Sequence, residues 1–326
     1  MGHAINDKTR YGGIERLVYE FSKELVKNHD VSVSGHIDSV YPQGVKLLAT
    51  KPTGDDTFAL DELRQFQQYE HILRKFDVIH DFSHQHLASR YLSNLPSLNL
   101  FWHAPNEVQY VKAPYNIIGL SKWACRQFEQ FYRQKALYQQ SILIDTEIYK
   151  PSNEPRNDFF LTIGVMSAQK GNLEAVLLCR DTKEKLYVCG GDGDAEYKRQ
   201  IQSLCDGENI KFLGEITDNE KIHLMQTCKA LLYYLPRPEV TSHKIQETML
   251  CGAAVLTSDI GAMPEIVRHG IDGILCHSDQ DYIKGIKEVG KLKPDVARLK
   301  EIYNPVKVVN DYIPLYTRVA NGERWR

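Results

Sequence analysis

The sequence has no apolar stretch long enough to cross a bilayer, so we expect no membrane-spanning helix. Neither sign of charge is in excess, because 40 Lys and Arg stand against 42 Asp and Glu and give a net charge of −2. A nearly neutral chain has no general attraction for phosphate backbones, and we expect no nucleic-acid partner. The first ten residues, MGHAINDKTR, do not resemble a signal peptide, so a cytoplasmic location is expected.

Cysteines in the C-x-x-C spacing are also absent, and the count of seven is odd, so we expect neither a zinc site nor a disulfide framework. Several cysteines lie inside apolar runs such as LYVCG and are expected to be reduced and buried. The seven are Cys125, Cys179, Cys189, Cys205, Cys228, Cys251 and Cys276.

The C-terminal half alternates short apolar runs with amphipathic stretches, which predicts parallel strands joined by helices. The runs are apolar throughout, as in strands that helices cover on both faces. The predicted strands are 159–164, 185–190, 209–214, 230–235, 253–258 and 273–276. The predicted helices are 171–180, 194–205, 218–228, 242–251, 263–269 and 279–290. Together they predict a doubly wound α/β domain that binds ligands at the carboxyl ends of its strands.

The N-terminal half has a similar but less regular pattern. A helix is predicted after Gly12 and Gly13, and an aromatic and basic helix over 121–139. The predicted strands are 31–37, 45–50, 77–82, 97–103, 116–121 and 141–144. Because segment 150–158 is polar and contains two prolines, it predicts a linker between domains 1–150 and 151–304. The default ligand site is then a cleft between two similar domains.

Two glutamates flank a predicted loop-to-helix junction. Glu239 follows an apolar strand, Thr241 or Ser242 is placed to cap the next helix, and Glu247 lies inside that helix. A helix start offers free N–H groups and a positive dipole end, which suits an anion. Carboxylates on either side of an anion site suit the hydroxyl groups of a nucleotide sugar. Two solvated glutamates are the alternative.

Residues 239–267, EVTSHKIQETMLCGAAVLTSDIGAMPEIV, resemble the pattern of the retaining glycosyltransferases of family 4. That pattern is E-x-F-G-x-x-x-x-E-A-M-A-C-G-x-P-V, followed by a strand and G-G-x-P-E. The matching residues are Glu239, Glu247, Met249, Cys251, Gly252, Val255, Gly261, Pro264 and Glu265. The resemblance extends to TIGVMSAQKGNLEAV, VCGGDGD, IKFLGEITDNEK, YGGIERLVYEFSKEL and LFWHAP. It implies two Rossmann-like doubly wound domains facing a cleft (the type B fold), with a last helix at about 305–326 that packs back on the first domain.

The resemblance also implies roles for single residues. Glu239 is implied to hold sugar hydroxyls, Lys170 to neutralise the diphosphate, and His103 to line the sugar and acceptor pocket. Glu247 is implied to bind the ribose, and Ile216 the base. The resemblance further implies that the donor is contacted by Gly12 and Gly13 and by the backbone amides of Val240, Thr241, Ser242 and His243. Plainer alternatives are a turn at the glycines, a backbone-bonded histidine and a core isoleucine.

The implied activity is transfer of a sugar from a nucleotide diphosphate to an acceptor hydroxyl, with retention. Retention is possible through same-face attack or through a covalent intermediate, and same-face attack is favoured because no carboxylate of the first domain is clearly placed as a nucleophile. A UDP-sugar is favoured as the donor, with a GDP-sugar as the alternative, and no cofactor or metal is expected. The acceptor is a saccharide, a lipid-linked glycan or a small molecule. An epimerase on the same fold and a weakly active sugar-nucleotide binding protein remain as alternatives.

The sequence departs from the family pattern at three places. Val165 replaces an arginine, so one cation for the diphosphate is missing, and Arg237, His243 or Lys244 is the expected substitute. Thr241-Ser242-His243 replaces F-G-L, which changes the backbone freedom of that loop. Only eleven residues precede Gly12, so we expect a first domain that is shortened at its start.

Two further segments have more than one interpretation. The cluster H-D-x-x-H-x-H at 80–86 suggests metal ligands, but residues on a strand ending near 82 would not converge, so we expect a polar pocket edge instead. The helix predicted over 121–139 is expected to pack as an ordinary amphipathic helix, with peripheral membrane contact as the alternative.

Overall fold

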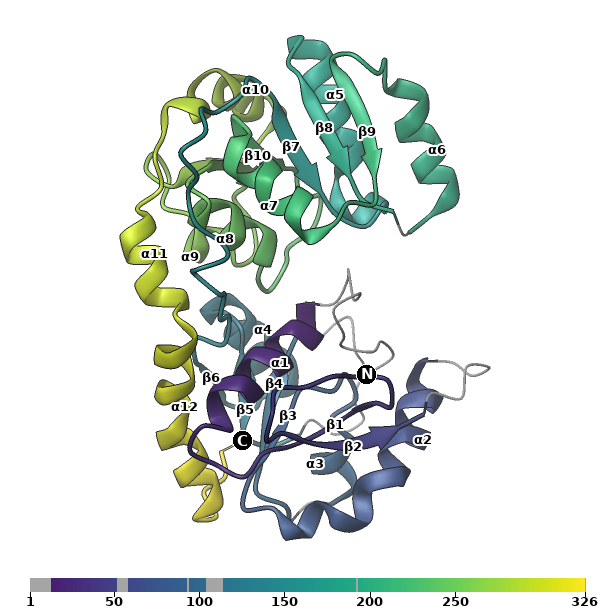
Figure 1. The fold of residues 1–326 in the computed structure, drawn as a ribbon, viewed down its shortest axis with the longest axis vertical. Helices are drawn as coiled ribbons and strands as arrows, with labels where there is room; N and C mark the ends of the chain where they lie inside the picture. Colours follow the sequence, from purple (N-terminus) through teal and green to yellow (C-terminus); the bar gives the residue numbers. More distant parts are fainter. Residues whose placement is uncertain (1–12, 52–57, 93, 104–113, 192, 326) are drawn as a thin grey trace. The chain divides into compact units, whose positions relative to one another are not determined.

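The computed structural model describes residues 13–51, 58–92, 94–103, 114–191 and 193–325. The chain divides into two compact units (Figure 1). The N-terminal unit comprises Met1–Ile144 with Tyr303–Arg326, and the C-terminal unit comprises Asp145–Ile302. These divisions lie beside the boundaries at 150/151 and 304/305 expected from sequence.

The sheet of the C-terminal unit contains the six strands predicted for this half of the chain. They are β7 Phe160–Ile163, β8 Leu186–Cys189, β9 Ile210–Gly214, β10 Ala230–Tyr233, β11 Ala254–Ser258 and β12 Gly273–Cys276. All pairings are parallel, in the order β12-β11-β10-β7-β8-β9. Leu231 of the central strand β10 lies opposite Leu161 on one side and Val255 on the other, and all three are fully buried. This burial on both faces explains why the strand sequences are apolar throughout.

Helices cover both faces of this sheet, since α5 packs beside α6 and α10 while α7 packs beside α8. The helices are η2 Ala168–Lys170, α5 Asn172–Thr182, α6 Ala195–Leu204, α7 Asp218–Thr227, α8 His243–Leu250, α9 Met263–Ile266, α10 Asp279–Glu288, η3 Val289–Lys291 and α11 Val296–Tyr303. Side chains fix several of their starts. Thr217 and Glu220 form a capping box on α7, and Ser278 accepts a hydrogen bond from Asp281 N at the start of α10. The doubly wound α/β architecture predicted from sequence is therefore confirmed.

The described strands of the N-terminal unit form two parallel sheets, β1-β2 and β3-β4-β5-β6. The strands are β1 Ser32–His36, β2 Lys46–Thr50, β3 Ile79–Asp81, β4 Ser97–Phe101, β5 Ile117–Gly119 and β6 Ala136–Tyr138. The helices are α1 Gly13–Leu25, α2 Phe58–Tyr69, η1 Glu70–Lys75, α3 Leu87–Tyr91, α4 Lys122–Tyr132 and α12 Pro305–Ala320.

Two predictions for this half were wrong. The helix predicted over 121–139 ends at Tyr132, because Arg133 takes the left-handed conformation (φ 56°) and terminates it. The strand predicted at 141–144 lies instead at Ala136–Tyr138, where it pairs with β5. Segment 141–144 is buried, and its Ser141 hydroxyl bonds to Tyr312 of α12 at 2.5 Å, so its apolar character reflects packing under a helix.

The last residues of the chain form part of the N-terminal unit's core. Helix α12 packs beside α1, with the rings of Tyr312 and Phe21 5.1 Å apart. Beyond α12, Trp325 is 7% exposed; its Nε1 donates to Ile117 O at 3.2 Å and its backbone N to Asn116 Oδ1 at 2.9 Å. Residues at the far end of the sequence thereby bond to the start of β5.

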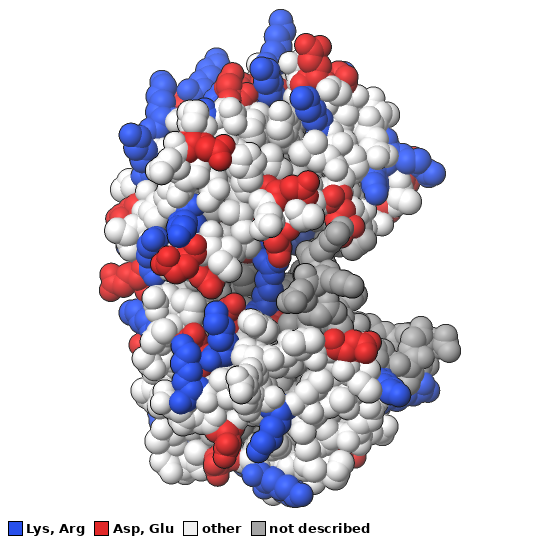
Figure 2. All heavy atoms as spheres, viewed as in Figure 1, with Lys and Arg blue, Asp and Glu red and all other residues white. Residues whose placement is uncertain are grey.

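The distribution of surface charge and the state of the cysteines agree with what the composition predicts. On the face seen in Figure 2, Lys and Arg side chains are interspersed with Asp and Glu side chains on each unit. All seven cysteines are free thiols, and all but Cys205 are buried, as expected. None of the helices in the described part of the chain combines the length and hydropathy of a membrane-spanning segment.

We expect the substitution Trp325→Ala to lower the free energy of unfolding of the N-terminal unit by about 3 kcal/mol, because a buried indole and its hydrogen bond are lost. Trp325→Phe keeps most of the ring and should cost about 1 kcal/mol. The exposed Asn321→Ala is the control and should change little. The other two tryptophans, Trp102 and Trp123, also belong to this unit, so fluorescence during denaturation reports on it. An unchanged midpoint for Trp325→Ala would contradict the packing described.

Candidate active site at the switch point of the C-terminal sheet

The strand order of the C-terminal sheet creates one switch point, between β7 and β10. From β7 the chain builds outward through β8 and β9, and from β10 it builds outward the other way through β11 and β12. In sheets of this kind the loops after the two central strands part from each other and leave a crevice at the carboxyl ends of the strands. The loop after β7 leads to Lys170, and the loop after β10 leads to Glu239. The two residues singled out from sequence therefore belong to the two loops of the switch point.

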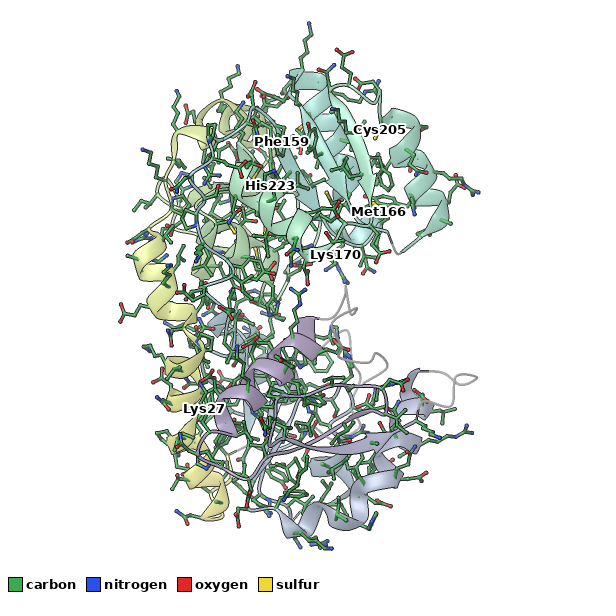
Figure 3. The ribbon with its side chains drawn as sticks, viewed as in Figure 1. Lys27, Phe159, Met166, Lys170, Cys205 and His223 are labelled. Atoms are coloured by element: carbon green, nitrogen blue, oxygen red, sulfur yellow. The ribbon has the colours of Figure 1, made fainter. Side chains whose placement is uncertain are left out.

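An ion pair joins these two loops. The Nζ of Lys170 lies 2.5 Å from Oε1 of Glu239, and the hydroxyl of Tyr233 donates to Oε2 of the same carboxylate at 2.8 Å. Both charged side chains are only partly exposed, whereas Tyr233 is 1% exposed at the end of β10. Burial and the charge of Glu239 raise the pKa of Tyr233 well above its usual value, so it stays a hydrogen-bond donor. Figure 3 labels Lys170 at the end of the C-terminal unit toward which strand β7 of Figure 1 points.

Two glycines hold the backbone of these loops in place. Gly171, after Lys170, has φ +64°, and a Cβ there would lie 2.2 Å from Tyr234 O. Gly261 has φ +62°, and a Cβ there would lie 2.6 Å from Glu239 O. The next residue, Ala262, donates its N–H to that same oxygen at 2.9 Å. Only glycine permits both the positive φ and this close approach, which explains why the G-A-M-P-E segment accompanies Glu239.

The glycine-rich turn after β8 lies as close to the loop after β7 as Gly171 and Gly261 lie to their neighbours. A Cβ on Gly190 would lie 1.9 Å from Gly164 O, and one on Gly193 would lie 2.3 Å from Met166 O. Met166 and Gly193 form an isolated parallel bridge. This turn therefore braces the segment that carries Lys170. Ile216 follows β9, just before the capping box of α7, and is half-buried.

Helix α8 begins directly after the Glu239 loop. Ser242 is its N-cap residue and is buried, although its side chain makes no capping bond, and His243 is its first residue. Val240 is buried and Thr241 is half-buried in the loop. The predicted donor-binding amides of these four residues thus lie at the amino end of α8, where N–H groups lack intrahelical partners.

Glu247 lies in the middle of α8 and is 7% exposed. Its Oε2 accepts a hydrogen bond from Lys221 Nζ of α7 at 3.1 Å. The same ammonium lies 5.1 Å from the centre of the Tyr149 ring. Lys221 and Tyr233 are the two site residues that sequence reasoning missed. Their only signal was position, since Tyr233 precedes Glu239 by six residues and Lys221 follows Ile216 by five.

Lys244 of α8 is the third cation of the site. Its Nζ donates to Ile163 O, the last residue of β7, at 2.7 Å and lies 4.5 Å from the centre of the Tyr233 ring. Burial lowers the pKa of Lys244 to about 8. Glu239 opposes this shift, and Lys170 adds to it. The ammonium is therefore less stable here than in water.

The remaining predicted residues belong to the N-terminal unit. Gly12 lies outside the described residues, and Gly13 is the exposed first residue of α1. His103 follows β4, and its Nε2 lies 3.0 Å from Nδ1 of His84, with the two rings stacked at 5.0 Å. Burial and the neighbouring His103 lower the pKa of His84 to about 4, so this histidine is neutral at physiological pH.

The histidine cluster at 80–86 separates into different environments. His80 is packed among the rings of Phe21 and Tyr312, and burial lowers its pKa to about 3. Asp81 pairs with a different histidine of the cluster, because its Oδ1 lies 3.6 Å from Nδ1 of His86. Over the described ranges, no group of three or more His, Cys, Asp and Glu side chains has an arrangement that could hold a metal ion.

We expect Gly261→Ala to displace the backbone of Glu239, because its new methyl group would overlap the Glu239 carbonyl. Gly270→Ala is the matched control, since Gly270 also has a positive φ (+77°) but no atom within 4 Å of its would-be Cβ. Both variants carry about 1 kcal/mol of backbone strain. Amide hydrogen exchange should accelerate in the Glu239 loop only in Gly261→Ala. Equal exchange in the two variants would contradict this role for Gly261.

Residues 145–303 match the family model described as glycosyl transferases group 1. The chain is 30% identical over 151 residues to a phosphatidyl-myo-inositol mannosyltransferase of Mycobacterium leprae (45% of this chain, 38% of that protein). It is 27% identical over 119 residues to the human alpha-1,3/1,6-mannosyltransferase ALG2 (34% of this chain, 28% of that protein). The chain thus spans less than half the length of these curated relatives.

The fold is similar to that of Anabaena Alr3699/HepE, solved in complex with UDP-glucose, with a TM-score of 0.71 at 16% identity over 96% of this chain and 98% of that one. This likeness, with the doubly wound sheet, identifies the two-domain type B fold. Over residues 145–303, the C-terminal unit is thus similar to the glycosyl transferases group 1 family.

Proposed function

We propose that the protein is a retaining glycosyltransferase that moves a sugar from a nucleoside diphosphate sugar to a hydroxyl group of an acceptor. One observation carries the proposal: the Lys170–Glu239 ion pair lies at the switch point of a group 1 glycosyltransferase domain. A cation and a carboxylate fixed next to each other at this point suit a ligand with a diphosphate joined to a hydroxyl-rich sugar.

Lys170 serves the leaving group in this proposal. When the bond between the sugar and the diphosphate breaks, negative charge develops on the diphosphate, and a fixed ammonium group stabilises it. Lys170 is held by Glu239, which Tyr233 holds in turn, so the ammonium needs little reorganisation. Backbone N–H groups of Val240–His243 at the start of α8 add to this stabilisation.

The two carboxylates bind hydroxyl groups. Glu239 accepts hydrogen bonds from the sugar, and Glu247 accepts them from the ribose. Ile216 contacts the base, and the backbone at Gly13 contacts the donor. His103, paired with His84, lines the part of the site that receives the acceptor.

Retention follows from attack on the same face from which the diphosphate leaves. The carbon–oxygen bond to the diphosphate breaks, a carbon–oxygen bond to the acceptor forms, and the acceptor proton passes to the departing diphosphate. Glu239 and Glu247 are each hydrogen-bonded to a lysine, which weakens them as nucleophiles for a covalent intermediate.

A UDP-sugar is the proposed donor, with a GDP-sugar second. Support comes from HepE, a protein of similar fold that was solved in complex with UDP-glucose. The mannosyltransferase names of the two relatives support transfer of a hexose. The acceptor is a saccharide, a lipid-linked glycan or a small hydroxylated molecule.

A thermal-shift panel of nucleoside diphosphates and nucleotide sugars tests the donor, because a ligand bound only by the folded state raises its stability. The stabilising donor is then incubated with acceptor panels and followed by NMR. We expect a product with the anomeric configuration of the donor. An epimerised donor without acceptor would support an epimerase instead, and binding without turnover for any acceptor would indicate a binding protein.

We expect Lys170→Met to lower the transfer rate by ~10²-fold or more, since the positive charge next to the leaving group is lost. Glu239→Gln should lower it similarly, since the group that holds Lys170 and the sugar hydroxyls loses its charge. Lys229→Met and Glu184→Gln are matched controls. Lys229 and Glu184 form a similar ion pair (2.8 Å) in the same unit but precede β10 and β8, at the amino ends of the strands. These controls should keep the rate within about twofold. Equal losses in both pairs would mean that the ion pairs act only on stability.

A further inference from the structure

We propose that Lys244 supplies the second cation that binds the diphosphate of the donor, in place of the family arginine that Val165 replaces. This inference rests on the proposed function. The arginine of the family pattern follows the glycine at the end of the first strand of the domain, which here is Gly164 after β7. Lys244 reaches the same strand end from another element, helix α8.

The ammonium group of Lys244 lies beside Gly164, the residue that precedes Val165. Lys244 Nζ donates to the carbonyl of Ile163, the residue before Gly164. A Cβ built on Gly164 would lie 3.0 Å from that Nζ and 3.9 Å from Lys170 Cβ. The ammonium of Lys244 and the stem of Lys170 thus both lie close to Gly164. A diphosphate bound by Lys170 at this strand end is therefore close to Lys244 as well.

The charges around Lys244 leave room for an anion. Lys170 pairs with Glu239, and Lys221 pairs with both Glu247 and Asp218. Within the described part of the chain, Lys244 forms no ion pair, and its contacts are a carbonyl and the ring of Tyr233. Of these three lysines, only Lys244 lacks a carboxylate partner among the described residues. A partly buried charge without a counter-ion is costly, and a bound diphosphate removes that cost.

A structural role is the competing explanation, in which Lys244 only anchors the end of β7 to α8. The two roles differ in their dependence on charge. Anchoring needs a hydrogen-bond donor and packing, whereas diphosphate binding needs the positive charge.

The first test is calorimetric titration of uridine diphosphate into the full chain at pH 7.5. We expect Lys244→Met to weaken binding by about tenfold or more and Lys244→Arg to weaken it less. Lys229→Met is the matched control, because Lys229 also lies over a ring, that of Phe160 at 4.9 Å, but at the other end of the strands. It should bind within about twofold of the unsubstituted protein. Equal affinities for Lys244→Met and the unsubstituted protein would overturn the inference.

The main measurement of a second test uses the unsubstituted protein, so it does not depend on whether a variant folds. A bound anion favours the charged form of Lys244, whose pKa is about 8 in the free protein. Titrations at pH 8.5 in buffers of different ionisation enthalpy should therefore show uptake of ~0.5 protons per diphosphate. The other groups facing Lys244 are Glu239, Lys170, Glu247, Lys221 and Tyr233. They remain in Lys244→Arg, in which the uptake should disappear. No uptake, or equal uptake in Lys244→Arg, would overturn the inference.

The failure of this inference is distinguishable from that of the proposed function. If the unsubstituted protein binds none of the diphosphates of uridine, guanosine, adenosine and thymidine, both proposals fall. If it binds one of them and Lys244→Met binds it equally well, only the role of Lys244 falls.

Discussion

The ion pair between Lys170 and Glu239 connects the two loops that part at the switch point of the C-terminal sheet. It forms only because β7 and β10 are neighbours in the sheet, although 66 residues lie between Ile163, the last residue of β7, and Ala230, the first residue of β10. The buried Tyr233 hydroxyl holds the second carboxylate oxygen and so sets the direction of the first. The arrangement is costly to break, because a partly buried charge would lose its partner.

Glycine makes this arrangement sterically accessible. The carbonyl of Glu239 contacts Gly261, that of Tyr234 contacts Gly171, and that of Gly164 contacts Gly190, each at a separation that a Cβ would not permit. Three segments distant in sequence are thereby packed backbone to backbone around the site. The loops that carry the charged residues are held by the sheet edge rather than by their own conformational preferences.

Much of the C-terminal unit follows from periodicity. All six strands and the helices between them were predicted, because a fully buried strand and an amphipathic helix leave different apolar patterns. The N-terminal unit was harder. Segment 141–144 is apolar because it lies under α12, and a short apolar run does not reveal whether a strand or a helix covers it. The roles of Glu239, Lys170 and Glu247 stay predictions that rest on family resemblance, and the structure adds their immediate partners.

The sequence alone determined which segments of the C-terminal unit become strands and helices, that two α/β domains are present, and which motifs carry charged residues. These properties depend on neighbours in the chain and on the period of apolar side chains. Only the tertiary structure decided the strand order, and with it that Lys170 meets Glu239, that Tyr233 and Lys221 join the site, and that Lys244 reaches the end of β7. Such contacts bring together residues far apart in the chain, and local patterns contain no information about which strands become neighbours.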